Sequence, residues 1–421
     1  MADGNDTHTG TPPHGGTETT TAAGAPHPPT DPYAIRPRPH NTPRPRRLVI
    51  ATMKDEGPYI LEWVAHHLNL GFDGFVIFSN DCTDGTNLIL NQLHKMRIIQ
   101  HFDNSAGLYR GSPECNRQTR AYRRARRLDV VRQADWVLVI DADEFLNIHA
   151  GDGSLDALLE AVPAHTDAIS VNWRHFGSAG QRNFYPAPVT RRFTRAQDVV
   201  RPGDTSLSMG FKTLFRPRSF LRFTPHRPVF DPDHGADLAA ITWVNASGQP
   251  MGNAYMEDRP LRCFSHSGNV SHEFAQVNHY AVKSRKEYLL QQLRGGVSFG
   301  LRGISYWERL DLNACEDCTI RSGDLEGRIA ALLQDAGLCA LHNASLYQTV
   351  RRMNHQARQP AAKAFVEGRV LTKAEAAALS PPRSKAELMA RLEKQALKAA
   401  RDARWAAKEA GKDKLATQSK N

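Results

Sequence analysis

Two aspartates follow a strongly apolar stretch in the middle of the chain. The segment Trp136 to Ile140 consists of large and β-branched apolar residues, and Asp141, Ala142 and Asp143 come directly after it. Such a run is typical of a central strand buried on both faces. Alternate residues of an extended chain point the same way, so both carboxylates are expected to project together. Carboxylate oxygens suit Mg²⁺ or Mn²⁺ with phosphate, although a strand that ends in a solvated acidic turn would show the same short motif.

An alternation of predicted strands and helices leads up to these aspartates. The predicted elements are strands at 47–53, 75–79, 96–102 and 136–140, and helices at 58–70, 87–95 and 114–134. This order predicts an α/β fold with a mostly parallel sheet flanked by helices. Ligands bind at the carboxyl edge of such sheets. The polar loops 54–57 and 80–86 are therefore expected to lie beside Asp141.

The first predicted helix contains two adjacent histidines. Apolar and aromatic side chains recur along it at helical spacing, and Gly71 follows it as a C-terminal cap. His66 and His67 belong to this stripe. We interpret them as packed, hydrogen-bonded residues rather than metal ligands.

Composition divides the 421 residues into a large core with extensions. Residues 1–47 are rich in Thr, Pro, Gly and His, which predicts a disordered arm. The core is expected over 48–300. A helical extension at 301–380, with helices at 325–337 and 346–359, and a basic tail at 381–421 follow. No stretch resembles a signal peptide or a membrane span, which predicts a cytoplasmic protein whose membrane association, if any, is peripheral.

Positive charge is concentrated in two segments. The formal net charge is +10, and the excess lies in 117–132 and in the Ala-, Lys- and Arg-rich tail from Arg383 to Lys414. Anionic lipid surfaces and nucleotide diphosphates are partners that this charge permits. Nucleic acid is not expected, because Trp405 is the only aromatic residue of the tail. The tail is interpreted as a solvated helix, with contact to an anionic membrane as the functional alternative.

The six cysteines fit a reducing compartment. Cys315 and Cys318 form the only CxxC sequence, and no second pair is present to complete a structural zinc site. The segment is interpreted as an ordinary loop.

Several short motifs, in this order and spacing, resemble the family 2 glycosyltransferases, and more narrowly the bacterial branch related to family 92. The resemblance covers about residues 48 to 300, and it implies a nucleotide-binding half at 48–150 and an acceptor half at 151–300. The motifs are Thr52-Met-Lys54-Asp-Glu56, Glu62-Trp63 with His66-His67, Asn80-x-x-Thr83-Asp84-Gly85-Thr86, Gln118-x-x-Ala121-Tyr122, Asp141-Ala-Asp-Glu-Phe-Leu146, Trp173-Arg-x-Phe-Gly-Ser178, Lys212-x-x-x-Arg216-Pro217, His226 and Asn278-His279-Tyr280-x-x-Lys283-Ser284. Two positions depart from the usual pattern, since Asp55 stands where Asn is usual and Cys82 where Ser is usual.

The resemblance implies a GT-A fold that binds a UDP- or GDP-linked sugar with Mn²⁺ or Mg²⁺ and inverts the anomeric centre. It implies that the loop Lys54, Asp55 and Glu56 contacts the nucleobase and that Asp84 holds base or ribose. It further implies Asp141 near ribose or metal, Asp143 as a direct metal ligand, and His279 at the metal or diphosphate, four residues before Lys283. The acceptor would be a glycan, a lipid-linked molecule or a cell-surface molecule.

The residue types suit this chemistry independently of the resemblance. Cleavage of the bond between sugar and diphosphate leaves negative charge, which a cation held by carboxylates, helped by Lys283, would stabilise. The acceptor hydroxyl needs a general base. Glu257 and Asp258 resemble the paired acids that supply it in related enzymes, while Asp231 and Glu273 are competitors.

Two further segments have open interpretations. One segment contains Trp173, Phe176 and Gly177. It forms either a wall against which a sugar or the acceptor stacks, or a turn in the core. Lys212 and Arg216 flank Leu214 along a predicted strand, which indicates one exposed face.

Two other functions compete with sugar transfer. A nucleotidyltransferase on a similar sheet would also use paired aspartates and metal, but the loop 54–57 is too short and acidic for its usual Gly-rich basic loop. A non-catalytic nucleotide-sugar or glycan-binding protein is the second alternative, and activity that is unchanged in Asp143→Ala would favour it.

Overall fold

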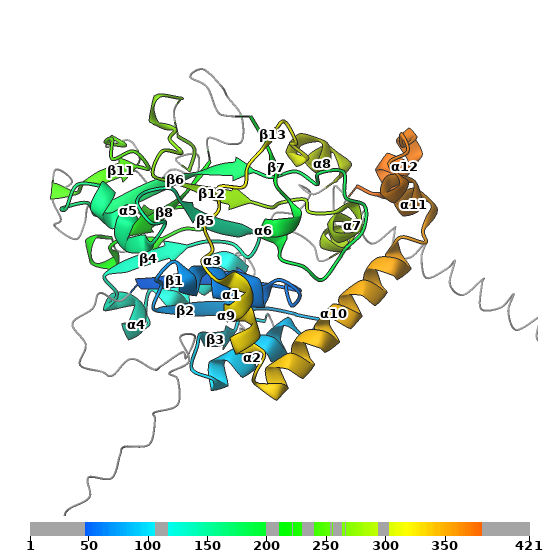
Figure 1. Ribbon diagram of the computed structural model, residues 1–421, viewed down its shortest axis with the longest axis horizontal. Helices are drawn as coiled ribbons and strands as arrows, with labels where there is room; N and C mark the ends of the chain where they lie inside the picture. Colours follow the sequence, from blue (N-terminus) through cyan, green and yellow to red (C-terminus); the bar gives the residue numbers. More distant parts are fainter. Residues whose placement is uncertain are drawn as a thin grey trace, which may run out of the picture. The chain divides into compact units, whose positions relative to one another are not determined.

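Nine strands of the described part of the chain form one mixed sheet (Figure 1). The computed structural model describes residues 47–105, 117–198, 210–220, 222–229, 240–252, 255, 263–265, 267–293 and 303–380. All of them belong to one unit, residues 37–421. The predicted arm before Arg47, the basic tail and the candidate bases Asp231, Glu257 and Asp258 lie outside the described residues.

The strand order confirms a mostly parallel sheet. The order is β3 (Gln100–Asp103), β2 (Gly74–Ser79), β1 (Arg47–Met53), β4 (Trp136–Val139), β8 (Phe211–Phe215), β6 (Ala168–His175), β12 (Ala275–His279) and β5 (Glu144–Ile148), with β11 (Trp243–Asn245) paired to β6. Strands β1 to β4 are mutually parallel, as are β6, β11 and β12. Strand β8 is antiparallel to both β4 and β6, and β5 is antiparallel to β12. Two small pairs, β9 (Arg222–Phe223) with β10 (Pro228–Val229) and β7 (Arg195–Ala196) with β13 (Cys315–Glu316), lie outside this sheet.

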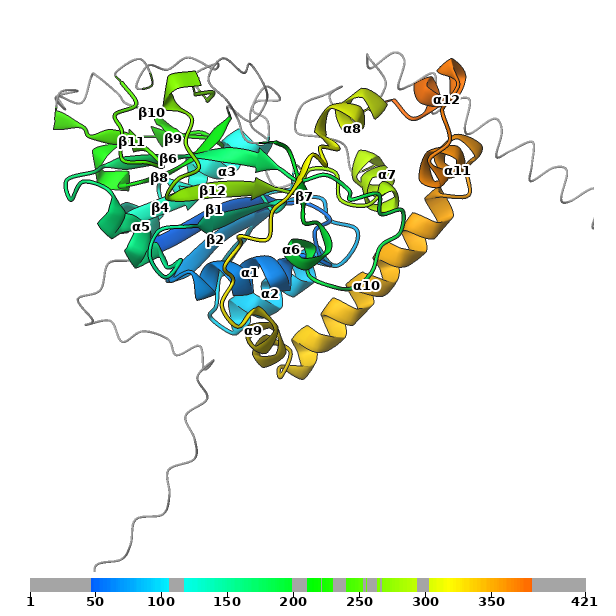
Figure 2. The ribbon, with the colours of Figure 1, turned by 45° about the horizontal axis from the view of Figure 1, so that its top comes forward.

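Helices flank the sheet and continue into the extension (Figure 2). They are α1 (Ile60–Asn69), α2 (Thr86–Lys95), α3 (Arg117–Ala125), α4 (Asp129–Arg132), α5 (Leu155–Ala161), α6 (Val189–Arg192), α7 (Arg285–Leu293), α8 (Ile304–Leu310), α9 (Leu325–Leu332), α10 (Ala336–Gln356), α11 (Pro360–Glu367) and α12 (Lys373–Ala378). Helix α9 packs on α1, and α10 packs on both α2 and α7. None of the helices in the described ranges is long and apolar enough to cross a membrane.

Two predicted elements of the nucleotide-binding half are shorter than expected. The helix expected over 114–134 is broken, because Leu128 adopts an extended backbone and starts α4, which places Val131 in the core. The strand expected over 96–102 begins only at Gln100, because Arg97 has a left-handed backbone with φ 61°.

The helices of the extension also differ from the prediction. Helix α9 ends at Leu332, and α10 begins ten residues before the expected start because the Asp335 side chain accepts a hydrogen bond from the Leu338 N–H as an N-cap. The interpretation of the CxxC segment as a loop is wrong at Cys315, which lies in the two-residue strand β13.

The extension shares a hydrophobic cluster with the core of the fold. Tyr288 of α7 packs edge-on against Trp307 of α8, and Trp307 packs in the same way against Phe365 of α11. All three side chains are buried. Aromatic contacts of this kind fix the extension to the element that follows β12.

The two histidines of α1 are packed and hydrogen-bonded, as predicted. His66 Nε2 lies 2.8 Å from the Leu146 carbonyl and Nδ1 lies 2.8 Å from Ser322 Oγ, while His67 Nδ1 lies 2.8 Å from the Trp63 carbonyl. A neutral His66 that donates from Nε2 and accepts at Nδ1 satisfies both contacts. Burial lowers the pKa of His66 to about 4.

Acid should destabilise the fold through His66. Its folded-state pKa lies below the ordinary value of 6.5, so the stabilisation is complete above pH 6.5 and is lost as the pH falls toward 4. The shift predicts a loss of about 2 kcal/mol in the free energy of unfolding between pH 7.5 and pH 5 from this residue alone. Urea denaturation of wild type and His66→Gln at both pH values checks this, because the variant should lose correspondingly less. Equal losses in the two proteins would contradict it.

Candidate functional site

The acidic motif forms a turn between two strands of the sheet. Strand β4 ends at Val139 and β5 begins at Glu144. Asp141 and Asp143 were expected on the extended end of a strand, but they lie in the turn between these two strands. The Glu144 N–H donates to the Asp141 carbonyl at 3.1 Å, and the Asp141 N–H donates to Glu144 Oε2 at 2.8 Å. This reciprocal pair closes the turn and directs the two aspartates to different partners.

Asp141 belongs to a buried ion cluster. Lys212 Nζ lies 2.7 Å from Asp141 Oδ2 and 3.1 Å from Glu144 Oε2, and Gln118 donates to Asp141 Oδ1 at 3.0 Å. The prediction of an exposed strand face at Lys212 is wrong, because its side chain is 0% exposed. Burial lowers the pKa of Lys212, but Asp141 and Glu144 outweigh burial and raise it above the ordinary value. Lys212 is therefore a permanent cation that holds the first aspartate in place.

Asp143 faces the end of β12. Its Oδ1 lies 3.9 Å from His279 Nε2, and its carbonyl accepts a hydrogen bond of 2.8 Å from the Tyr280 N–H. Asp143 and His279, which were predicted to act at the same site, are therefore neighbours in the structure.

Other rings surround His279. The ring centroids of Trp173 and His175 lie 5.1 and 4.9 Å from that of His279, and His226 lies 5.3 Å from Trp173. Burial lowers the pKa of His226 to about 3, so its imidazole is neutral at physiological pH. The aromatic wall interpretation of Trp173 is compatible with this setting, while Phe176 packs against Tyr280 in the core.

These donors fit a divalent cation that shares its shell with a bound diphosphate. Asp143 and His279 face each other and are the residues that would hold the ion, with the 30% exposed Asp141 beside them, although Gln118 and Lys212 already contact its carboxylate oxygens. Within the described ranges no set of three His, Cys, Asp or Glu residues could hold a metal alone. Mg²⁺ is commonly bound by one or two carboxylates, with phosphate oxygens and waters filling the octahedron.

The exit loops of β1 and β2 are joined by side-chain hydrogen bonds. Asp55, whose φ is 52°, accepts from the Thr83 N–H at 2.6 Å. The Glu56 N–H donates to Thr86 Oγ1 at 2.7 Å. Asp84 accepts from the Gly57 N–H at 3.0 Å and is buried. The two polar loops therefore meet as predicted, and Asp84 fastens them to each other.

A small cavity opens beside this loop pair. Asp55, Tyr59, Lys283, Glu287 and Thr349 are among the residues that line it. Lys283 has φ 54°, and its Nζ lies 4.7 Å from the centre of the Tyr59 ring. The Tyr59 hydroxyl donates to Glu287 Oε1 at 3.0 Å. The cavity, of about 20 Å³, is lined by a carboxylate, an ammonium group and an aromatic ring, and it has room for about one water molecule.

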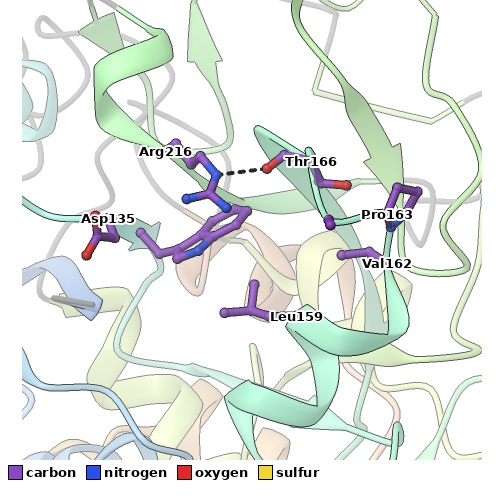
Figure 3. Close-up of a pocket in the computed structure, with 8 residues that line it drawn as sticks. Asp135, Leu159, Val162, Pro163, Thr166 and Arg216 are labelled. Carbon is purple, nitrogen blue, oxygen red and sulfur yellow. Dashed lines mark hydrogen bonds between the residues drawn. The ribbon is translucent and has the colours of Figure 1, made fainter. Parts of the chain in front are cut away.

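A second cavity, of about 340 Å³, lies at the amino-terminal end of β4 (Figure 3). Asp135 and Trp136 line it at the start of β4, together with Thr166, which precedes β6. Arg216 covers the Trp136 ring at 4.4 Å and donates to the Thr166 carbonyl at 2.9 Å. The indole face is already occupied, and the histidines and acidic turn described above lie at the other end of the strands.

The structure brings together most of the predicted site residues. Asp55, Glu56 and Asp84 meet in the loop pair, Asp143 meets His279, and Lys283 lines the small cavity. Lys54 is half-buried in the same loop.

Sequence reasoning missed Lys212, Glu144 and Thr349 as parts of the site. A lone lysine between aromatic residues in a predicted strand, Phe211-Lys-Thr-Leu-Phe215, is a signal for a buried charge. For Thr349, far along the chain in α10, the sequence holds no such signal.

No protein-family model matches the chain. A curated relative described as a glycosyltransferase family 92 protein, from Ricinus communis, is 25% identical over 172 residues. The match covers 38% of this chain and 29% of the relative, so the chain spans less than a third of that protein.

The chain also shows weak similarity to three solved structures. TarS from S. aureus has a TM-score of 0.25 and 14% identity, with 41% of this chain and 28% of TarS covered. A TarS fragment in complex with UDP has a TM-score of 0.25, 16% identity and coverage of 41% and 47%. The bifunctional glycosyltransferase WbbM has a TM-score of 0.21, 16% identity and coverage of 30% and 23%. Scores this low do not establish a shared fold.

Proposed function

We propose that the protein is a metal-dependent glycosyltransferase that moves a sugar from a UDP- or GDP-linked donor to a hydroxyl of a glycan, a lipid-linked molecule or a cell-surface molecule. The observation that carries the proposal is the meeting of three segments at one sheet edge. The loop at Asp55, the acidic turn at Asp143 and the segment from His279 to Lys283 come from distant parts of the sequence. A nucleoside, a diphosphate and a cation require these three kinds of group together.

The sequence match to the family 92 relative supports sugar transfer as the general activity. The GT-A fold, the family 2 pattern, inversion of the anomeric centre and the type of sugar are further parts of the proposal, based on the motif resemblance. The test of nucleotide binding below does not depend on these further parts.

Each group of site residues would have its own role in binding the donor. The loop at Lys54, Asp55 and Glu56 would contact the nucleobase, and Asp143 with His279 would hold Mn²⁺ or Mg²⁺ against the diphosphate. A bound cation would neutralise charge that develops on the leaving diphosphate. Lys283 would contribute a second positive charge near the same group. Lys212, whose side chain is 0% exposed, would hold Asp141 in place through its ion pair without contacting the donor.

Transfer breaks the bond from the anomeric carbon to the diphosphate oxygen and forms a bond from that carbon to the acceptor oxygen. The acceptor attacks from the face opposite the leaving group, which inverts the centre, and its hydroxyl proton passes to a general base. Asp258, Glu257 and Asp231 are the proposed candidates for this base, from the sequence pattern alone.

Calorimetric titration tests the function directly. UDP, GDP and UDP-linked sugars are titrated into the full chain with and without Mn²⁺. We expect one nucleotide diphosphate to bind with an affinity that rises about tenfold or more when Mn²⁺ is present, because the ion bridges diphosphate and carboxylate. Failure of every nucleotide to bind a folded sample would overturn the proposal. Formation of a sugar-acceptor product separates a transferase from a binding protein.

A further inference from the structure

The larger of the two cavities described above lies outside the site of the acidic turn. Its volume of about 340 Å³ falls in the range of small-molecule pockets, about 300 to 1,000 Å³. Trp136 lines it at the start of β4, five residues before Asp141. A strand advances about 3.3 Å per residue, so the cavity lies roughly 17 Å from the acidic turn. A ligand bound in the cavity would therefore not touch that turn.

Two opposite charges lie on the same side of this cavity. Figure 3 shows Asp135 and Arg216 on one side of the space and Val162 and Pro163 on the other. Arg216 Nε donates to the Thr166 carbonyl, and within the described ranges its two Nη groups donate to no other residue. Burial lowers the pKa of Arg216, while nearby carboxylates, including that of Asp135, raise it. The cavity thus presents a cationic hydrogen-bond donor beside an anionic acceptor, opposite an apolar wall.

A buried hydroxyl of the lining has no partner in the described part of the chain. Thr166 lines the cavity and is 1% exposed, and its Oγ1 forms no hydrogen bond there. The contacts of Thr166 with Pro163 and Arg216 involve only its backbone. A buried hydroxyl without a partner costs free energy. A molecule bound in the cavity would supply the missing partner.

This mixture of groups selects a neutral ligand that is rich in hydroxyls. An anion would meet the Asp135 carboxylate and a cation would meet the Arg216 guanidinium, so either ion would be repelled by one of the two. Each hydroxyl of a sugar both donates and accepts. One hydroxyl can therefore accept from the guanidinium while its neighbour donates to the carboxylate. The C–H face of a sugar ring is apolar and suits the side chains of Leu159, Val162 and Pro163.

We propose that this cavity binds one sugar unit of a glycan, with Asp135, Thr166 and Arg216 as its polar contacts. The inference rests on the proposed function for the source of the glycan, which would be an acceptor long enough to reach from the cavity to the acidic turn. It also gives a role to Arg216, which belongs to a motif of the resemblance but is remote from that turn. A distal sugar held in the cavity would favour long acceptors over short ones.

Saturation-transfer difference NMR tests the cavity with simple sugars. Glucose, galactose, mannose, rhamnose and N-acetylglucosamine are added separately to the full chain, and inorganic phosphate and L-leucine are then added as an anionic and a zwitterionic competitor. The proteins are wild type, Thr166→Val, Ala164→Phe and Ala187→Phe. Ala164 is an exposed residue of the lining, so a phenyl ring there would occupy part of the cavity. Ala187 is an exposed alanine outside the lining and serves as the matched control.

We expect at least one sugar to bind wild type and Ala187→Phe equally well. Ala164→Phe should weaken this binding about 10-fold or more, because its ring fills the space of the ligand. Thr166→Val should weaken it about 3- to 10-fold through the loss of one hydrogen bond. The melting temperature of Thr166→Val should stay the same or rise by a few degrees, because the substitution removes no contact within the protein.

Several results would overturn the inference. They are failure of every sugar to bind a folded wild-type sample, binding that Thr166→Val and Ala164→Phe leave unchanged, and displacement of the sugar by phosphate or L-leucine. A clear fall in the melting temperature of Thr166→Val would assign its hydroxyl to folding and would also count against it. The titration with UDP and GDP is independent. Nucleotide binding without sugar binding leaves the proposed function standing, whereas sugar binding in the cavity without nucleotide binding overturns that function and supports the cavity.

Discussion

Asp143→Asn is expected to remove the Mn²⁺-dependent part of nucleotide diphosphate binding and to lower kcat/KM for the donor about 100- to 1000-fold. The substitution keeps the size of the side chain and its backbone contact with Tyr280 but removes the charge that faces His279. Because the leaving diphosphate gains negative charge in the transition state, loss of the ion costs more there than in the ground state. The decrease should therefore appear in kcat as well as in KM. Initial rates over a range of donor and Mn²⁺ concentrations measure it.

Glu160→Gln is the matched control for this charge removal. Glu160 is an exposed carboxylate on α5 and makes no contact with the site. Its variant should keep wild-type rates and the same Mn²⁺ dependence. Full activity of Asp143→Asn would show that the acidic turn does not hold the ion and would favour a binding protein that kept the fold.

Lys212→Met is expected to lower the free energy of unfolding by about 3 to 5 kcal/mol, because it leaves the buried Glu144 carboxylate and the partly exposed Asp141 carboxylate without their cation. The Glu144 carboxylate is 1% exposed and that of Asp141 is 30% exposed. Burial raises the pKa of Glu144 above its ordinary value. A group whose folded-state pKa is raised contributes stability at low pH that is lost as the pH rises, so the variant should recover part of its stability near pH 5. Urea denaturation at pH 5 and pH 7.5 measures both effects.

Two further variants determine whether loss of charge causes the lower stability of Lys212→Met. Lys363→Met removes an exposed lysine that pairs with Glu367 along α11, and it should change the stability very little. The double variant Lys212→Met with Glu144→Gln should be more stable than Lys212→Met alone, since one uncompensated charge is gone. If the double variant is no more stable than Lys212→Met, the lower free energy of unfolding of Lys212→Met arises from packing rather than from the ion cluster.

The fold could be predicted to the extent that local periodicity controls it. The stripe of α1, the cap at Gly71 and the apolar runs of β1, β2 and β4 led to the parallel half of the sheet, which the structure confirms. The break at Leu128 was missed because a run of arginines supports one long helix locally, while burial of Val131 decides otherwise. The position of β8 between β4 and β6 depends on pairing across the whole chain, which no local pattern specifies.

The site was predictable where it consists of loop motifs and unpredictable where it depends on packing. The meeting of the Asp55 and Asp84 loops follows from parallel order alone. The geometry of the acidic turn was wrong, because a strand pattern cannot show that Glu144 folds back onto the Asp141 N–H. The contact of Asp55 with Arg352 joins residues almost 300 positions apart and leaves no trace in spacing.

Strand β8 also joins the two sides of the sheet. It pairs with β4, which precedes the acidic turn, and with β6, which leads to the histidine cluster, so β8 hydrogen-bonds to a strand on each side. Many two-lobed enzymes swing their lobes together about a hinge to enclose a substrate. Here such a rotation would have to break the β8 ladder and pull Lys212 from its two carboxylates. Closure by rotation of one side of the sheet against the other is therefore not expected in this protein.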